Sequence, residues 1–292
     1  MSRSSDAPWL VVGGSGAVGR FLLRALAERG QATWALSRDP PPDWARGWHA
    51  IEWRRGALAD AAELIACAPV LLSAGPLDAL ADACAAQPPP PGARVVALSS
   101  LSILWKAASP DPEERRLAQC LVRAEQRLAT ACSAASLQLL RAGLIWGAGV
   151  DRSLSALLRL ARRWGGLPWP QAARGLRQPV HAADLAQALL IAAVRPETTP
   201  HALHLPGPDA LPFDRMLDRM LAAAAPTLQR WPLPCPRWAA VLAWRCAGRH
   251  RSTLTPLLRA FNDQSAAADD WRRLNLQPRG FDPTPMDFVA WS

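Results

Sequence analysis

The 292-residue sequence has no tyrosine, and Lys106 is its only lysine. The missing tyrosine excludes every mechanism in which a phenol hydroxyl gives or takes a proton, and the single lysine leaves one side chain for any step that needs an ammonium group. The six cysteines are scattered, without the paired short spacings of zinc or disulfide frameworks. We therefore expect reduced thiols and no metal site.

Long apolar runs and local concentrations of one charge are also lacking. No apolar stretch approaches the roughly 20 residues of a membrane span, and the first expected strand begins at residue 9, which leaves no room for a signal peptide. We therefore expect a cytoplasmic protein without a membrane span. The net charge of +9 is carried almost entirely by arginines spread along the chain, so we expect no nucleic-acid partner.

What the sequence does have is a glycine-rich turn between an expected strand and an expected helix. Residues 9–12 are apolar, as in a strand buried on both faces of a parallel sheet. Glycines follow at positions 13, 14, 16 and 19, and apolar residues then recur at helical spacing until Gly30. Such a turn lets the backbone approach a pyrophosphate, and the helix N-terminus offers N–H donors to it. The segment predicts a dinucleotide site; the alternative is a glycine-rich turn in another α/β protein.

Strand and helix patterns alternate to about residue 145, which predicts an α/β fold with a doubly wound parallel sheet. Further strands are expected at 31–36, 49–54, 70–73, 94–99 and 137–140, and helices at 77–86 and 113–132. After residue 147 the patterns predict, in order, a helix at 153–164, a Trp/Pro/Gly loop at 165–174, a helix at 182–194, a strand at 202–205 and a proline-rich helical remainder.

The spacing Gly13-x-x-Gly16-x-x-Gly19 resembles that of extended and atypical short-chain dehydrogenases/reductases (SDRs), the group that includes NAD-dependent epimerases and dehydratases. The likeness covers most of residues 9–210. Residues 140–149 are similar to the segment beside the nicotinamide in that family, and residues 177–184 resemble a stretch of nucleotide-sugar epimerases. The resemblance implies a Rossmann sheet with a bound nicotinamide dinucleotide.

The resemblance also implies two parts. The first is a Rossmann domain over residues 1–150, to which the chain returns at about 177–206; the second is a small, mostly helical substrate lobe over 151–176 and 207–292. Five tryptophans in or near the lobe are expected in its core or in the wall of a pocket: Trp164, Trp169, Trp231, Trp238 and Trp244. Residues 236–249 are an alternative surface for a membrane or a partner helix.

The type of dinucleotide depends on the end of the second expected strand. Ser37-Arg38 stands where NAD-specific sites usually carry an acidic residue for the ribose 2′-hydroxyl, and an arginine there suits the 2′-phosphate of NADP. NADP is therefore expected, and Asp39, one position late, keeps NAD open. The residues expected at the cofactor are Gly13, Ser15, Gly16, Ala17, Val18, Gly19, Ser37, Arg38, Ala74, Gly75 and Ser99.

The resemblance breaks at the catalytic residues. In the family a tyrosine and a lysine one helical turn apart handle the proton, and a serine or threonine orients the substrate carbonyl. Arg123-Ala-Glu125 resembles the end of the stretch that carries the pair, so counting back places the tyrosine at Leu117 and the lysine at Leu121; the serine or threonine falls on Leu101. The triad is degenerate, and the helix is expected to present an apolar stripe of Leu117, Leu121, Ala124 and Leu128.

Ser102 and Lys106 are candidate catalytic substitutes, because they follow the fifth expected strand on the expected cofactor side. Desolvation would lower the pKa of Lys106 and suit it to proton donation; the alternative is a solvated loop lysine. By the resemblance, Arg177 faces a substrate diphosphate through its guanidinium fork, or it is a structural arginine at the lobe junction. His181 and Asp184 are expected to pack and to cap a helix.

Two functions stay open. The first is an NADP-dependent SDR-like oxidoreductase or nucleotide-sugar epimerase/dehydratase that acts on an anionic small molecule with a non-standard acid or base. The second is a non-catalytic NADP-binding sensor, regulator or scaffold, which an intact glycine turn beside a leucine-filled helix favours. Asp111, Glu113 and Glu114 are expected to form only the acidic first turn of a helix. A homodimer is open by analogy with the fold.

Overall fold

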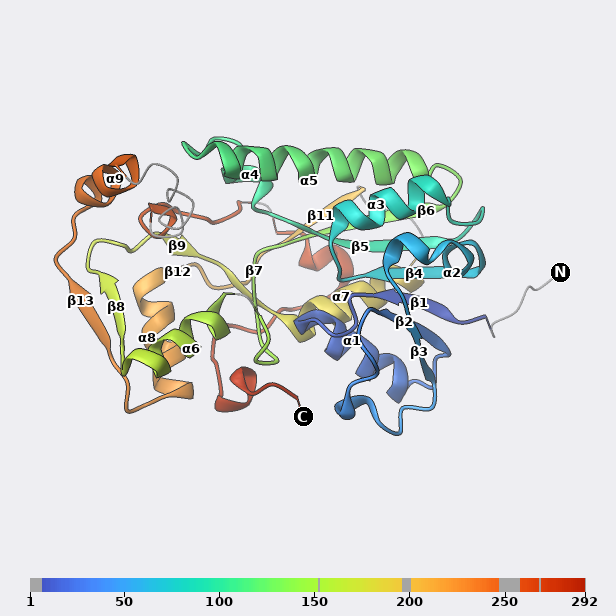
Figure 1. Cartoon of the computed structure of the whole chain (residues 1–292), viewed down its shortest axis with the longest axis horizontal. Helices are drawn as coiled ribbons and strands as arrows, with labels where there is room; N and C mark the ends of the chain where they lie inside the picture. Colours follow the sequence, from blue (N-terminus) through green and yellow to red (C-terminus); the bar gives the residue numbers. More distant parts are fainter. Residues whose placement is uncertain (1–6, 152, 196–200, 247–257, 268, 292) are drawn as a thin grey trace.

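A seven-stranded parallel sheet forms the centre of the protein, in the order β11-β6-β5-β4-β1-β2-β3 (Figure 1). The computed structural model describes residues 7–151, 153–195, 201–246, 258–267 and 269–291. The strands of the sheet are β1 (Trp9–Val12), β2 (Thr33–Ser37), β3 (Ile51–Arg55), β4 (Val70–Ser73), β5 (Arg94–Ser100), β6 (Ser136–Ala142) and β11 (Ala202–Leu205). The predicted doubly wound fold is confirmed, and the strand order reverses between β1 and β4, where ligands bind in such sheets.

Helices cover both faces of this sheet. One face carries α1 (Ala17–Glu28) and α7 (Ala182–Val194), and the other carries α2 (Ala62–Cys67), α3 (Leu77–Ala86) and α5 (Pro112–Ala131). Successive side chains of a strand point to opposite faces, so Val11 packs with α1 and α7 while Leu10 and Val12 pack on the other side. Burial on both faces explains why β1 reads as a continuous apolar run.

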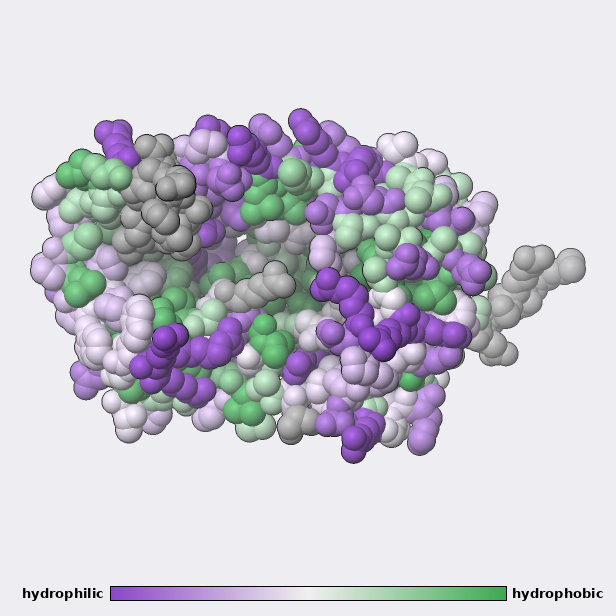
Figure 2. Space-filling model, viewed as in Figure 1, coloured by the Kyte–Doolittle hydropathy of each residue, from purple (hydrophilic) through white to green (hydrophobic). Residues whose placement is uncertain are grey.

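The lobe has a hydrophobic core of its own, beside the sheet. Its helices are α6 (Leu154–Trp164), α8 (Phe213–Ala224) and α9 (Arg237–Cys246), and its core includes Trp146 and Phe281. Two two-stranded sheets accompany these helices: β9 (Leu176–Arg177) with β12 (Leu211–Pro212), and β8 (Leu167–Pro170) with β13 (Arg230–Leu233). A third pair, β7 (Leu144–Trp146) with β10 (Pro179–His181), lies at the junction, because Val180 packs in the core of the main sheet and Trp146 in that of the lobe. Figure 2 shows the surface hollowed between the lobe and the sheet.

The loop expected at 165–174 is wrong in part, because it contains β8. Its prolines, Pro168 and Pro170, cannot donate ladder hydrogen bonds and so hide the strand in the sequence. Pairing with β13 is instead made through other groups, such as the N–H of Leu167, which donates to the carbonyl of Gln229 at 3.0 Å. A strand with one partner tolerates proline better than one inside a larger sheet.

One segment assigned to the lobe packs on the sheet instead. Trp271 and Leu274, in a 3₁₀ turn (Trp271–Leu274), belong to the core beneath α1 and α7. The indole N–H of Trp271 donates to the carbonyl of Pro206 at 2.6 Å, just after β11. We propose the same two parts as before: a Rossmann domain over residues 1–150 and 177–206, and a lobe over 151–176 and 207–292. Residues 269–276 are moved from the lobe to the Rossmann domain.

The last described residues connect the lobe to α1. Phe288, in a 3₁₀ turn (Pro285–Phe288), is buried in the lobe core. Three residues later, the ring of Trp291 lies edge-on to that of Phe21 in α1, with centroids 5.0 Å apart, and near Trp44. The remaining short elements are α4 (Ile103–Lys106) and 3₁₀ turns at Asp43–Ala45 and Leu58–Asp60. None of the helices in the described ranges has the length and apolar character needed to cross a membrane.

Candidate functional site

The turn between β1 and α1 lies directly against the turn after β4. Gly13 has φ +80°, a left-handed conformation that glycine adopts without strain. A Cβ atom at Gly13 would stand 2.6 Å from the backbone nitrogen of Gly75 and 2.7 Å from the carbonyl carbon of Ala74. Three of the residues predicted for the cofactor therefore meet at the point where the strand order reverses.

The N-terminus of α1 is open. Gly16 is the N-cap residue, no described side chain caps it, and the first turn has no acidic residue. The first N–H groups of a helix lack intrahelical acceptors and form the positive end of its dipole. Gly19 allows the close approach of helix and turn, since a Cβ there would stand 2.1 Å from the carbonyl oxygen of Gly13. The N–H groups at Ala17 and Val18 thus sit where an anion is stabilised.

A pocket of about 370 Å³ opens beside this turn. Gly13 and Ser15 line it from one side, and Ser37 and Arg38 from the end of β2. All four are among the residues expected at the cofactor, and their contact with a cofactor stays a prediction. The hydroxyl of Ser37 accepts a hydrogen bond from the N–H of Asp39 at 3.1 Å, which fixes that turn. Asp39 also lines the pocket, and the rest of the wall was not expected from the sequence: Val12, Leu36, Gly56, Ala57, Leu58, Ala59, Pro76 and Ala79. Since β3 pairs with β2, the residues that follow β3 could have been expected beside those that follow β2.

Ser99 is engaged elsewhere. Its hydroxyl donates to Oε1 of Glu125 at 2.6 Å, and Arg141 in β6 binds the same carboxylate through Nε (3.0 Å) and Nη2 (2.5 Å). Nη1 of Arg141 lies 3.1 Å from Nε2 of His204 in β11. The hydrogen bonds to Glu125 raise the pKa of Arg141. This largely buried network joins β5, β6, β11 and α5, and the cofactor contact of Ser99 stays a prediction.

The prediction of an apolar stripe along α5 is confirmed for its second half and wrong for its first. Ala124 and Leu128 are buried against the sheet, but Leu117 is 46% exposed and Leu121 is half-buried. At the first turns of α5 the buried residues are Glu114 and Ala118, so the buried side of the helix does not include Leu117. Both leucines nevertheless stand on the helix where the family resemblance places a tyrosine and a lysine, and they offer only hydrocarbon.

The candidate Ser102 is the N-cap residue of α4 and stands two residues after the end of β5. Its hydroxyl accepts a hydrogen bond from the hydroxyl of Ser100 at 2.9 Å, and its N–H donates to the same oxygen at 3.1 Å. The neighbouring Leu101 is 1% exposed and packs in the interior. Ser102 keeps its own hydroxyl hydrogen for a further acceptor, so it can orient a carbonyl oxygen.

The candidate Lys106 ends α4 and is half-buried. Its ammonium group has no hydrogen-bond or ion-pair partner within the described ranges. Burial lowers the pKa of Lys106, the positive charge of Arg259 lowers it further, and Glu114 opposes both effects. A lowered pKa brings an ammonium group closer to proton donation near neutral pH. The structure thus differs from the alternative of a fully solvated loop lysine.

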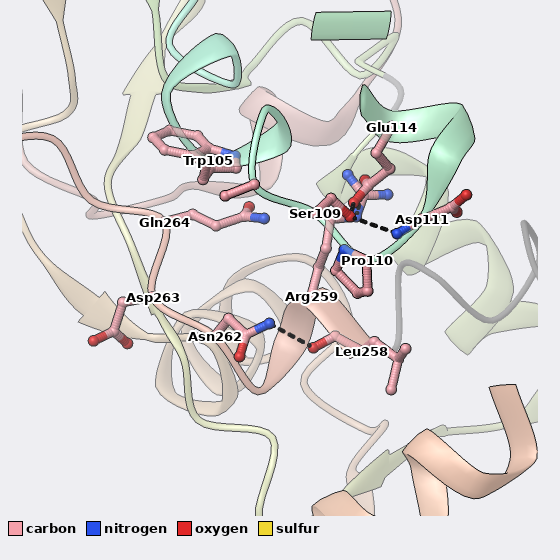
Figure 3. A pocket seen from close by; sticks show the side chains of 11 residues that line it. Trp105, Ser109, Pro110, Asp111, Glu114, Leu258, Arg259, Asn262, Asp263 and Gln264 are labelled. Atoms are coloured by element: carbon pink, nitrogen blue, oxygen red, sulfur yellow. Dashed lines mark hydrogen bonds and ion pairs between the residues drawn. The ribbon is translucent and has the colours of Figure 1, made fainter. Parts of the chain in front are cut away.

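A second cavity, of about 120 Å³, lies between the α4–α5 connection and residues 258–264 (Figure 3). Glu114 accepts a hydrogen bond from the hydroxyl of Ser109 at 2.6 Å, and its Oε1 lies 3.0 Å from Nε of Arg259. Trp105, Asn262 and other residues complete the lining. Burial lowers the pKa of both Lys106 and Arg177, and the guanidinium of Arg259 lowers both further, while Glu114 and Asp263 oppose it. The lining of the cavity itself holds three carboxylates, Asp111, Glu114 and Asp263, beside Arg259.

The sequence only partly anticipated this cavity. Asp111 caps α5 by accepting the N–H of Glu113 at 2.9 Å, as expected for an acidic first turn. Glu114 differs, because it is 9% exposed and faces the cavity. Its partner Arg259 lies far away along the chain, so no local pattern marks the pair.

Arg177 is 3% exposed and bound to backbone. Nη1 donates to the carbonyls of Leu176 (2.7 Å) and Asn262 (2.8 Å), and Nη2 donates to the carbonyl of Arg259 (2.7 Å). The guanidinium stands over the ring of Phe213 at 4.9 Å. Burial lowers the pKa of Arg177 to about 10, with a further contribution from Arg259. These contacts favour the structural alternative over a diphosphate contact.

His181 caps α7, as expected. Its Nδ1 accepts the N–H of Ala183 at 3.1 Å, so Nε2 carries the hydrogen and donates to Oδ1 of Asp287 at 3.2 Å. Asp184 does not cap the helix; its carboxylate accepts from the backbone N–H and from Nε of Arg279, both at 2.9 Å. Both side chains therefore fasten C-terminal segments to the start of α7.

The lobe tryptophans have different environments. Trp169 is buried and stacks on Phe213, with centroids 4.8 Å apart and planes 5° apart. Trp164, Trp231 and Trp238 are exposed, so the expectation that they belong to the lobe core is wrong for these three. The side chain of Trp244 and residues 247–249 lie outside the described part of the chain.

No protein-family model and no curated protein sequence matches the chain. Solved structures do resemble it. The NAD-dependent NDP-hexosamine 5,6-dehydratase TunA, involved in tunicamycin biosynthesis, has a TM-score of 0.68 at 17% identity, over 97% of this chain and 96% of its own. The Bordetella bronchiseptica enzyme WbmH, in complex with NAD⁺, has a TM-score of 0.64 at 13% identity, over 96% of each chain.

A third similar structure is the UDP-N-acetylglucosamine 4-epimerase from Methanobrevibacter ruminantium M1 in complex with UDP-N-acetylmuramic acid. Its TM-score is 0.67 at 11% identity, over 99% of this chain and 98% of its own. At these identities the likeness shows a shared fold, sheet and lobe together. The fold expected from the resemblance to extended SDRs is confirmed at that level.

Proposed function

We propose that the chain binds a nicotinamide dinucleotide at the pocket between the turns after β1, β2 and β4. The observation that carries the proposal is the contact of Gly13 with Gly75 beside the open N-terminus of α1, which leaves backbone N–H groups for a pyrophosphate. The similar structures of TunA and WbmH, whose names include NAD, support the same cofactor class. Arg38 in the pocket wall supports NADP, and Asp39 beside it supports NAD.

The activity that the site supports best is that of an SDR-like oxidoreductase or nucleotide-sugar epimerase/dehydratase acting on an anionic substrate. When bound, the nicotinamide would supply hydride transfer. The cavity at Glu114 and Arg259 would hold part of the substrate, with the guanidinium of Arg259 as the donor to an anionic group. Ser102 would hold the substrate oxygen, and Lys106 would move the proton in place of the absent tyrosine.

A second function has an observation in its favour. By the family resemblance, Leu117, Leu121 and Leu101 stand where the catalytic groups are expected, and the chain has no tyrosine. A positioned acid or base is worth about 10²–10⁴ in rate, so its loss would leave binding with little turnover. The alternative is a non-catalytic dinucleotide-binding sensor, regulator or scaffold.

Titration with NADPH and NADH, followed by energy transfer from tryptophan to the dihydronicotinamide, tests the binding step. Gly16→Asp and Gly16→Asn form a matched pair: both side chains are good helix caps, and a Cβ at Gly16 meets only the carbonyl of Gly13 at 3.3 Å. Only aspartate adds a charge facing a pyrophosphate. We expect the aspartate variant to bind roughly ten-fold more weakly than the asparagine variant. Equal binding by the two, or no binding by the natural protein, contradicts the proposal.

Turnover then separates the two functions. Nucleotide sugars are incubated with the protein and dinucleotide, and epimerised or dehydrated products are measured by NMR. Loss of turnover in Lys106→Gln, with unchanged dinucleotide affinity, supports the enzyme. Tight dinucleotide binding without any product from the natural protein supports the non-catalytic function.

A further inference from the structure

One end of the lobe exposes an unusual group of large apolar side chains. We call this surface the lobe end; it consists of Trp164 (51% exposed), Trp231 (45%), Leu233 (42%), Trp238 (70%) and Leu242 (55%). They come from the end of α6, from β13 and from α9, which follow the left end of the molecule in Figure 1 from the lower side (α6) through β13 to the upper side (α9). Scattered exposed apolar residues need no explanation, but a gathered set marks a contact surface.

The members of the lobe end follow one another in space. A Cβ at Gly166 would stand 2.4 Å from the indole of Trp231, which places Trp231 over the turn that follows Trp164. Trp231 and Leu233 are two residues apart in β13 and so point to the same side. Trp238 and Leu242 are four residues apart in α9 and share one helix face. The inward side of α9 is marked by Ala240, which is 2% exposed.

The four elements that form this end carry cationic side chains and no carboxylate of their own, although Arg230 at the start of β13 is paired with Asp218 of α8 at 2.9 Å. The elements α6, β8, β13 and α9 contain no aspartate or glutamate, and the chain has none from residue 219 to residue 262. Exposed arginines accompany the apolar side chains: Arg159, Arg162, Arg163, Arg237 and Arg245. In a chain with 24 acidic residues, their exclusion from these elements gives the lobe end a positive field.

We propose that the lobe end docks on the surface of a membrane that contains anionic lipids. Indole rings favour the boundary between headgroups and acyl chains, and arginine side chains extend along it to lipid phosphates. Leu233 and Leu242 would enter the same layer. Each cationic side chain near such a surface adds attraction that salt screens. A single-stranded nucleic acid would instead need a groove that tracks its backbone, whereas these residues occupy an end of the molecule.

The test is co-sedimentation of the full chain with vesicles of phosphatidylcholine alone and of phosphatidylcholine mixed with phosphatidylglycerol. We expect binding to the mixed vesicles, little binding to phosphatidylcholine, and release at high salt. Tryptophan emission should shift to the blue on binding and be quenched by lipids brominated in the upper acyl chain. No binding to mixed vesicles, or tighter binding to an oligodeoxythymidine than to these vesicles, would overturn the proposal.

Matched variants place the contact. Trp238→Glu is compared with Val194→Glu, which changes a 65% exposed valine at the end of α7, outside the lobe end. Arg163→Gln/Arg237→Gln is compared with Arg24→Gln/Arg116→Gln, two exposed arginines on α1 and α5. The double substitution Arg163→Gln/Arg237→Gln should weaken partitioning into the mixed vesicles about 25-fold, because each lost charge weakens it about five-fold. Equal losses in the control variants contradict the proposal, and circular dichroism and thermal melting confirm that each variant is folded.

Discussion

Ser99 donates a 2.6 Å hydrogen bond to Glu125, and the same carboxylate is held on its other side by Arg141. This contact links the end of β5 to the middle of α5. It sets the distance between the strand that leads into Ser102 and Lys106 and the helix that carries Leu117 and Leu121. The two sides of the candidate catalytic region are therefore joined by a carboxylate that Ser99 and Arg141 already bind.

Removing that carboxylate's charge should destabilise the protein. Glu125→Gln leaves Arg141 partly buried without its counter-ion, and we expect a loss of roughly 2–3 kcal/mol in the free energy of unfolding, below the values for fully buried pairs because the Arg141 side chain is 23% exposed. Urea denaturation measures the change. The control is Glu28→Gln, whose pair with Arg24 is exposed and should contribute less than about 1 kcal/mol. Equal effects of the two substitutions would contradict the prediction.

The contact between His181 and Asp287 gives a pH dependence of stability. Burial alone would raise the pKa of Asp287, but hydrogen bonds from His181 and Thr284 outweigh it and hold the pKa below the ordinary 3.8. A depressed carboxyl pKa stabilises the fold above the ordinary value, and this contribution disappears as the pH falls through the folded-state pKa. Asp287→Asn should therefore destabilise the protein by roughly 1–3 kcal/mol at neutral pH. The difference from the natural protein should shrink as the pH falls through about 4.

Urea titrations at a series of pH values measure this difference. Asp43→Asn is the control, because that carboxylate is exposed beside Arg46. A difference between the natural protein and Asp287→Asn that stays constant from neutral to acid pH would show that the carboxylate charge plays no part.

Arg177 should be a stability residue. Arg177→Met removes charged donors from three backbone carbonyls, those of Leu176, Asn262 and Arg259, and we expect a loss of roughly 3 kcal/mol or more in the free energy of unfolding. Arg177→Lys should recover little, because one ammonium group cannot reproduce the fork. Thermal and urea melts measure both variants, with the exposed Arg116→Met as control. Unchanged melts, together with weaker binding of anionic ligands, would favour the diphosphate contact instead.

The choice between NADP and NAD should depend on Arg38. If its guanidinium meets a 2′-phosphate, Arg38→Ala weakens NADPH binding roughly ten-fold and leaves NADH binding unchanged. Fluorescence titration with both dinucleotides measures the ratio. Arg46→Ala is the control, an exposed arginine near the same strand that does not line the pocket. An unchanged ratio in Arg38→Ala would leave Asp39, and with it NAD, as the favoured partner of the ribose.

Local patterns predicted the sheet well, and the reason is physical. The strands at 70–73 and 202–205 and the helices at 77–86 and 182–194 have the expected bounds. Strands buried on both faces are continuous apolar runs, α3 carries one buried face, and α7 is a longer apolar run buried over most of its surface, so each element can be recognised alone. The glycine turn is also a local feature, because Gly13, Gly16 and Gly19 contact one another within a single turn of seven residues.

Contacts between distant segments were not predictable in the same way. The sequence indicated Glu114 only as an acidic residue in the first turn of a helix, but its buried carboxylate is paired with Arg259, far along the chain. Arg177 likewise donates hydrogen bonds to the carbonyls of Arg259 and Asn262. The exposed positions of Trp164, Trp231 and Trp238 were missed for a related reason. Composition indicates that a tryptophan is apolar, and only the packing of the lobe decides which indoles find a partner.

The C-terminal segment affects how the molecule comes apart. Phe288 is anchored in the core of the lobe, and Trp291, three residues on, is anchored against Phe21 of the sheet domain. If one core unfolds while the other stays folded, either Phe288 loses its contacts in the lobe or Trp291 loses its contact with Phe21. The two bodies should consequently lose their structure in one cooperative step, so that heating gives a single calorimetric transition and not two. The C-terminal segment thus makes the stability of each hydrophobic core depend on the other.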